Sequence, residues 1–122
     1  MHHRIDSFRD LIVWQKAMDL ADLVYIEVKH LPSDELFGLV SRLRRASVSI
    51  PSNIAEGWGR GRSSDFLRYL RISRGSLFEV ATQAELCSRA GYRGNWDRVL
   101  QQSEELSRIL YGLMKSVERD LR

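Results

Sequence analysis

Apolar residues recur along this chain of 122 residues at intervals of three and four, the spacing that places them on one side of an α-helix. The pattern is interrupted at Pro32, at the glycines that follow Glu56 and near Gly91, where turn-forming residues gather. No segment shows the strict alternation that is typical of a half-buried strand. The sequence therefore predicts four helices, at about residues 8–31, 34–58, 64–90 and 95–121.

Each expected helix begins at a side chain that can cap its first turn, namely Ser7, Ser33, Ser63 or Ser64, and Asn95. Acidic residues follow these caps at most of the starts, where the helix dipole favours negative charge. Four long helices joined by short turns are typical of an antiparallel up-down-up-down bundle. We therefore expect one all-α domain that spans residues 1–122.

The first segment is apolar on more than one side. Its expected core stripe consists of Leu11, Trp14, Ala17, Met18, Ala21, Val24, Tyr25, Val28 and Leu31. Ile12, Leu23 and Ile26 lie off this stripe, among polar residues. A helix that is apolar on several faces buries several faces, so we expect these three residues to lie at an interface between subunits.

A proline, Pro51, lies inside the second segment. Because proline removes a backbone hydrogen bond and crowds the carbonyl of Ser47, it predicts a kink. The apolar phase continues beyond Pro51, which favours one bent helix over two. Structural roles are expected for its neighbours: Asn53 bonded to the backbone near the kink, Glu56 paired with an arginine, and Gly57 at the start of the glycine-rich end.

Composition excludes several classes of protein. Hydrophobic residues make up 43% of the chain and charged residues 29%, as in ordinary soluble domains. No run is long enough to span a membrane, and the single cysteine, Cys87, cannot form an internal disulfide, which fits the cytoplasm. His2 and His3 could bind a metal, but a terminal pair is more simply an unstructured end. Without a metal-ligand motif or a paired acid and base, we expect no enzyme, no cofactor and no metal.

Positive charge is concentrated between residues 42 and 74, where eight arginines face two acids for a local net charge of +6, against +3 for the whole chain. Arginine suits contacts with phosphate, but it also suits ion pairs between subunits, and a solvated helix face is equally compatible with the charge. Trp58 and Tyr69 could stack on bases. The candidate nucleic-acid-binding residues are Arg42, Arg45, Arg60, Arg62, Arg68, Arg71 and Arg74.

Three segments resemble the bacterial 23S rRNA intervening-sequence family, whose members are also labelled S23 ribosomal proteins. They are FRDLIVWQKAMDLADLVY at 8–25, LVSRLRRASVSIPSNIAEGWGR at 39–60 and FLRYLRISRGSLFEVATQ at 66–83. The resemblance implies an antiparallel four-helix bundle that assembles into a pentameric, barrel-like ring. It also implies kinship with the accessory variability protein of diversity-generating retroelements, a basic pentamer that works with a reverse transcriptase and nucleic acid.

Two functions remain open on this evidence. The first is a non-enzymatic, cytoplasmic homo-oligomer that binds RNA or DNA through its arginines, with a nucleic-acid enzyme as a partner by analogy. The second is a scaffold for protein–protein interaction with no nucleic-acid role. Binding measured in rising salt separates them, because phosphate contacts weaken steeply with salt and an apolar interface does not.

Overall fold

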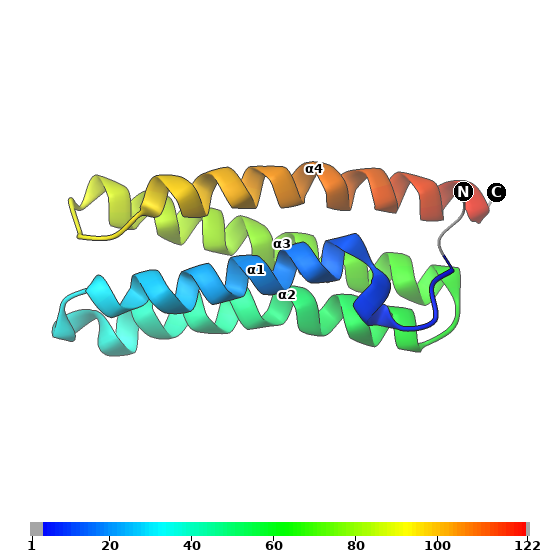
Figure 1. Ribbon diagram of the computed structural model, residues 1–122, viewed down its shortest axis with the longest axis horizontal. Coiled ribbons are helices and arrows are strands. Elements are labelled where there is room, and N and C mark those ends of the chain that lie inside the picture. Colours follow the sequence, from blue (N-terminus) through cyan, green and yellow to red (C-terminus); the bar gives the residue numbers. More distant parts are fainter. Residues whose placement is uncertain (1–3, 122) are drawn as a thin grey trace.

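The computed structural model describes residues 4–121, and this part of the chain contains helices and turns but no strand. The long helices are α1 (Ile12–Glu27), α2 (Ser41–Gly59), α3 (Ser63–Arg89) and α4 (Trp96–Asp120). In Figure 1, α1 and α3 run in one direction, and α2 and α4 in the other. The fold is the all-α four-helix bundle that the sequence predicted. His2 and His3 lie outside the described residues.

The first helix begins later than its cap suggested. Ser7 caps a separate 3-10 turn, η1 (Phe8–Asp10), and Asp10 accepts a hydrogen bond from the backbone N–H of Ser7 at 3.1 Å. Leu11 is then extended, with φ −73° and ψ 126°, so α1 starts only at Ile12. At its other end α1 passes into a second 3-10 turn, η2 (Val28–His30).

The connection between α1 and α2 is more elaborate than the simple turn that the sequence predicted. A 3-10 turn, η3 (Ser33–Glu35), leads into a π-helical segment, η4 (Leu36–Val40), in which Gly38 has non-helical angles of φ −106° and ψ −109°. The Glu35 carboxylate fixes this corner by accepting hydrogen bonds from the Leu39 backbone N–H at 3.2 Å and from the Tyr92 hydroxyl at 2.9 Å. Phe37 projects from the corner and is 92% exposed.

The core is a continuous cluster of buried apolar side chains from all four long helices. Its contribution from α1 differs from the predicted stripe. Trp14 is half-buried, and Met18 and Tyr25 are 38% and 41% exposed. The buried residues of α1 are Val13, Ala17, Leu20, Ala21, Leu23, Val24 and Glu27. Because apolar residues surround most of this helix, periodicity alone did not determine which side faces the centre.

Small polar residues join α2 to α3. The Ser73 hydroxyl donates to the carbonyl of Ile50 at 2.9 Å, and the hydroxyls of Ser49 and Ser76 lie 2.8 Å apart. Asn53 donates from its side-chain amide to the Ser49 carbonyl at 2.8 Å, the backbone contact expected of it. The helix α2 continues through Pro51 without a break, as the unbroken apolar phase predicted.

Candidate nucleic-acid interface

The turn between α2 and α3 presents two of the predicted arginines to solvent. The helix α2 ends at Gly59, Gly61 adopts a left-handed φ of +78°, and Arg62 is extended before α3 begins. Only glycine takes that angle without strain, so Gly61 allows the chain to reverse within three residues. Arg60 and Arg62 flank Gly61 and are both exposed.

Arg60 is the most constrained of these side chains. Its Nη2 lies 2.9 Å from Glu56 Oε1 and 2.8 Å from the hydroxyl of Tyr69. Its guanidinium also lies 5.2 Å from the centre of the Tyr69 ring. The hydrogen bond to Glu56, followed by the charges nearby, raises the pKa of Arg60 above its ordinary value. The contact with Glu56 is the glutamate–arginine pair that the sequence led us to expect, and the contacts with Tyr69 hold Arg60 against α3.

Arg62 and Arg68 have no ion pair within the described part of the chain. Arg68 lies 5.8 Å from the centre of the Tyr69 ring and is exposed. No side chain caps α3, so the prediction that Ser63 or Ser64 would do so is wrong. The first backbone N–H groups of a helix attract anions when no cap occupies them. Two unpaired guanidinium groups and an uncapped helix start therefore lie at the same turn.

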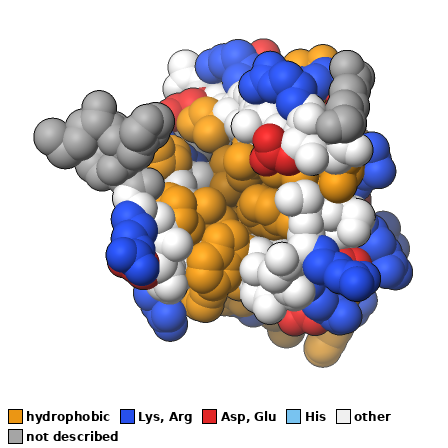
Figure 2. Space-filling view, turned by 90° about the vertical axis from the view of Figure 1, so that its right-hand side faces the viewer, with side chains coloured by type: hydrophobic (Ala, Val, Ile, Leu, Met, Phe, Trp, Pro, Cys, Tyr) orange, Lys and Arg blue, Asp and Glu red, His pale blue; other side chains and the backbone are white. Residues whose placement is uncertain are grey.

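An apolar hollow adjoins this turn. It is lined by Trp58, Gly59, Gly61, Arg62, Ser63 and Phe66. Trp58 is half-buried, so it is partly a packing residue and partly a surface on which a base could stack. Figure 2 looks at this end of the bundle and shows apolar side chains at the centre with basic side chains around the rim.

The remaining predicted arginines do not join this cluster. Arg71 lies 3.5 Å from Glu118 of α4, and the Arg74 guanidinium lies 5.1 and 5.7 Å from the ring centres of Phe78 and Tyr111. Arg42 and Arg45 are exposed near the start of α2, about 25 Å along that helix from its glycine-rich end at 1.5 Å per residue. The seven predicted arginines therefore lie in three separate regions of the bundle.

The expected interface residues of α1 separate in the structure. Ile12 and Ile26 are 61% and 54% exposed, which leaves their side chains open to another molecule. Leu23 is only 8% exposed and belongs to the core, so its assignment to an interface is wrong. It packs inward because α1 faces both α2 and α4. Lys16 marks the side toward α4, since its Nζ lies 3.1 Å from Glu105 Oε1.

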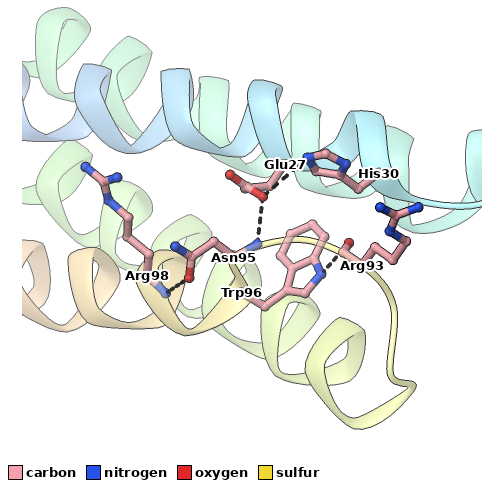
Figure 3. A network of polar contacts seen from close by, with 6 residues as sticks. All are labelled: Glu27, His30, Arg93, Asn95, Trp96 and Arg98. Atoms are coloured by element: carbon pink, nitrogen blue, oxygen red, sulfur yellow. Dashed lines mark hydrogen bonds and ion pairs between the residues drawn. The ribbon is translucent and has the colours of Figure 1, made fainter.

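At the opposite end of the bundle, a buried acid anchors the turn between α3 and α4 (Figure 3). Glu27 is 8% exposed, and its Oε1 accepts a hydrogen bond from the backbone N–H of Asn95 at 2.7 Å. The same oxygen lies 3.9 Å from His30 Nε2. Asn95 in turn caps α4 by accepting from the Arg98 N–H at 3.2 Å, as its sequence predicted. Sequence reasoning missed Glu27, because a glutamate near a helix end carries no signal of burial.

The single cysteine, Cys87, is part of the core. Cys87 is fully buried, and desolvation, followed by the charge of Glu35, raises the pKa of its thiol to about 11. A thiol with that pKa is protonated at neutral pH and is a poor nucleophile. Among residues 4–121 no group of three or more His, Cys, Asp or Glu side chains could hold a metal ion. Within the same range, no helix has the length and apolar character needed to cross a membrane.

Comparison with known proteins agrees with this architecture. Residues 9–112 match the sequence profile of a family described as 23S rRNA-intervening sequence protein. Among solved structures, the fold is similar to a crystal structure from Bacteroides thetaiotaomicron VPI-5482, a protein of unknown function from the S23 ribosomal protein family. That likeness has a TM-score of 0.77 and 23% sequence identity, and it covers 85% of this chain and 96% of the other. None of the curated proteins compared with the chain matches it.

Proposed function

This chain belongs to the 23S rRNA-intervening sequence protein family, and we propose that it is a non-enzymatic, self-associating bundle that binds RNA or DNA as an accessory factor. The observation that carries the proposal is the α2–α3 turn, where Arg62 and Arg68 are exposed and unpaired beside the uncapped start of α3. Phosphate oxygens accept hydrogen bonds both from arginine guanidinium groups and from the backbone N–H groups at a helix start. Such contacts hold the nucleic-acid backbone and do not read its sequence.

One copy alone offers a small basic site. Around the turn, Arg60 is already paired with Glu56, and Asp65 lies in the first turn of α3. Self-association would multiply the site, since several weak contacts on one nucleic acid combine into useful avidity. The number that we propose for the assembly is five, the pentameric ring implied by the family resemblance. A nucleic-acid enzyme remains a partner proposed by analogy alone.

The experiment compares two variants of equal charge change at low salt. Arg62→Glu with Arg68→Glu removes the proposed phosphate donors, whereas Arg93→Glu with Arg98→Glu alters exposed arginines at the other end of the bundle. The first pair is expected to weaken binding of labelled RNA and duplex DNA at least tenfold, and the second pair much less. Equal losses from both would indicate a general effect of net charge and would remove the site from the α2–α3 turn.

A scaffold for protein interaction without a nucleic-acid role is the second candidate. It is favoured by apolar grooves on two sides of the bundle, one between α1 and α2 and one between α3 and α4. Wild-type protein that assembles but binds neither RNA nor DNA at low salt would select this function over the first.

A further inference from the structure

A groove with an apolar floor runs along the surface between α1 and α2. It is lined by Trp14, Met18, Ala21, Asp22 and Tyr25 of α1 and by Val48, Pro51, Ser52 and Ala55 of α2. The groove continues toward the α1–α2 corner, because Tyr25 and Val48 also line the next hollow. That second hollow adds Leu36, Phe37, Ser41, Arg44 and Arg45. The exposed apolar side chains of the whole groove are Met18, Tyr25, Leu36, Phe37 and Val48, and neighbouring exposed apolar side chains with a polar rim are typical of an interaction site.

The corner end of this groove combines an aromatic side chain with positive charge. Phe37 is 92% exposed, and the π-helical corner holds it away from the core of its own bundle. Arg44 lies 5.5 Å from the ring centre of Tyr25, and Arg44 and Arg45 both line the hollow beside it. A molecule that binds this end of the groove should therefore present an apolar pocket to Phe37 and a carboxylate to the arginines.

The opposite side of the bundle carries a surface with those properties. A hollow of about 500 Å³ lies between α3 and α4, with Leu77, Phe78, Ala81 and Leu100 among its walls. Three carboxylates also line it, those of Glu85, Asp97 and Glu104. Glu104 is exposed and makes no ion pair within the described part of the chain.

The two surfaces lie at the same level of the bundle but on opposite sides. Each helix packs on the next along the chain and α4 packs on α1, so the α1–α2 pair and the α3–α4 pair form opposite faces. The α1–α2 corner lies at the end where α3 passes into α4 (Figure 1). The acidic hollow lies in the same half of the bundle, from Asp97 near that end to Leu77 near the middle of α3. Two bundles placed side by side in the same orientation would bring basic groove against acidic hollow.

We propose that the occupant of the α1–α2 groove is a second copy of this chain, which presents its α3–α4 face. Phe37 of one copy packs against the part of the hollow beside Leu100 of the next, which lies nearest the α3–α4 turn, and Arg44 and Arg45 pair with its acids. The contact joins two different faces, so it repeats from copy to copy and closes into a ring or extends as a filament. This inference rests on the self-association proposed above and specifies the surfaces that perform it. The α2–α3 turns of all copies would then lie at one end of the assembly.

A charge exchange tests the pairing. Arg45→Glu and Glu104→Lys each place like charges across the contact, so each is expected to raise the dissociation constant of the assembly at least tenfold. The double variant within one chain restores opposite charges at every contact and is expected to recover the wild-type mass. Sedimentation velocity measures the mass, and circular dichroism verifies that each variant is folded.

An apolar pair of variants tests the anchor independently. Phe37→Ala is expected to dissociate the assembly as strongly as either charge reversal without loss of fold, because Phe37 is almost fully exposed. Ile72→Ala is the control, since Ile72 is also an exposed apolar residue, at 42%, but lines neither groove.

The outcomes separate the two proposals. A monomeric wild-type protein would refute self-association itself, and with it this inference. Assembled wild-type protein whose mass is unchanged by Arg45→Glu, Glu104→Lys and Phe37→Ala would overturn the pairing of these faces while leaving self-association intact. Dissociation by the single charge reversals without recovery in the double variant would also overturn the pairing, and a foreign partner would then be the occupant to seek.

Discussion

Gly57→Ala should weaken the bundle at the place where α2 and α3 approach most closely. A methyl group on Gly57 would lie 2.6 Å from Cβ of Tyr69 and 3.3 Å from Cδ1 of Phe66. Favourable carbon contacts lie at about 3.5–4.0 Å, so the helices must separate by roughly 1 Å. Both neighbouring atoms belong to α3, and one is a Cβ that cannot rotate away.

Two opposing terms set the size of the effect. Alanine is favoured over glycine inside a helix by about 0.8–1.0 kcal/mol, although Gly57 lies near the end of α2, where the gain is smaller. Inserting a methyl group into a packed contact costs about 1–3 kcal/mol. The control is Gly112→Ala in α4, where a Cβ would meet no atom within 4 Å and only the favourable term operates.

The expected difference in free energy of unfolding between the two variants is therefore about 1–4 kcal/mol, with Gly57→Ala the less stable. Urea unfolding followed by circular dichroism measures it, at one protein concentration because self-association would contribute to apparent stability. Equal stability of the two variants would refute the close packing at Gly57. Because Tyr69 also contacts Arg60 and Arg68, a shift at this point should disturb the arginines of the turn.

Three further predictions concern the core and the far end of the bundle. Leu23→Asp should unfold or strongly destabilise the protein, by at least the ~2–5 kcal/mol that truncating a buried leucine costs. Ile12→Asp should leave thermal stability nearly unchanged, so similar melting curves for the two variants would contradict the inward position of Leu23. Glu27→Ala should cost about 1–3 kcal/mol because it removes the acceptor of the part-buried hydrogen bond from the Asn95 N–H. Glu27→Gln retains an acceptor and should cost less in urea unfolding; the reverse order would argue against this anchor. In the folded protein at pH 8, Cys87 should react slowly with a thiol reagent, and the rate should rise as the pH approaches its pKa of about 11. At pH 8 the reaction should become rapid only when the protein unfolds; fast labelling of the folded protein at pH 8 would show that the thiol is not protected.

The buried face of a helix could be predicted from the sequence only where its apolar and polar faces differ clearly. In α4 one side is apolar and the other polar, and the buried residues follow the spacing of three and four that predicted the helix: Trp96, Val99, Ser103, Leu106, Leu110, Met114 and Val117. In α1 the contrast is weak, so the predicted stripe included Met18 and Tyr25, which line a surface groove instead.

The site was harder to predict than the fold because it depends on contacts between distant residues. Arg68, Arg71 and Arg74 recur at intervals of three in the sequence, but only the folded chain pairs Arg71 with Glu118 and places Arg74 near two aromatic rings. Likewise, no local pattern marks Phe37 as exposed, since its position follows from the π-helical corner around Gly38. Local signals were sufficient for Asn95 and Glu56, whose partners lie within four residues.

The most direct test of the central claim is a binding titration of the wild-type protein with labelled structured RNA and duplex DNA at about 50 and about 200 mM salt. A phosphate-binding surface predicts measurable affinity at the lower concentration and a steep loss at the higher one. The slope should be about 0.7–0.9 log units per phosphate neutralised, and Arg62→Glu with Arg68→Glu should reduce it. Absence of binding at the lower salt concentration would contradict a nucleic-acid role and leave these arginines to protein contacts.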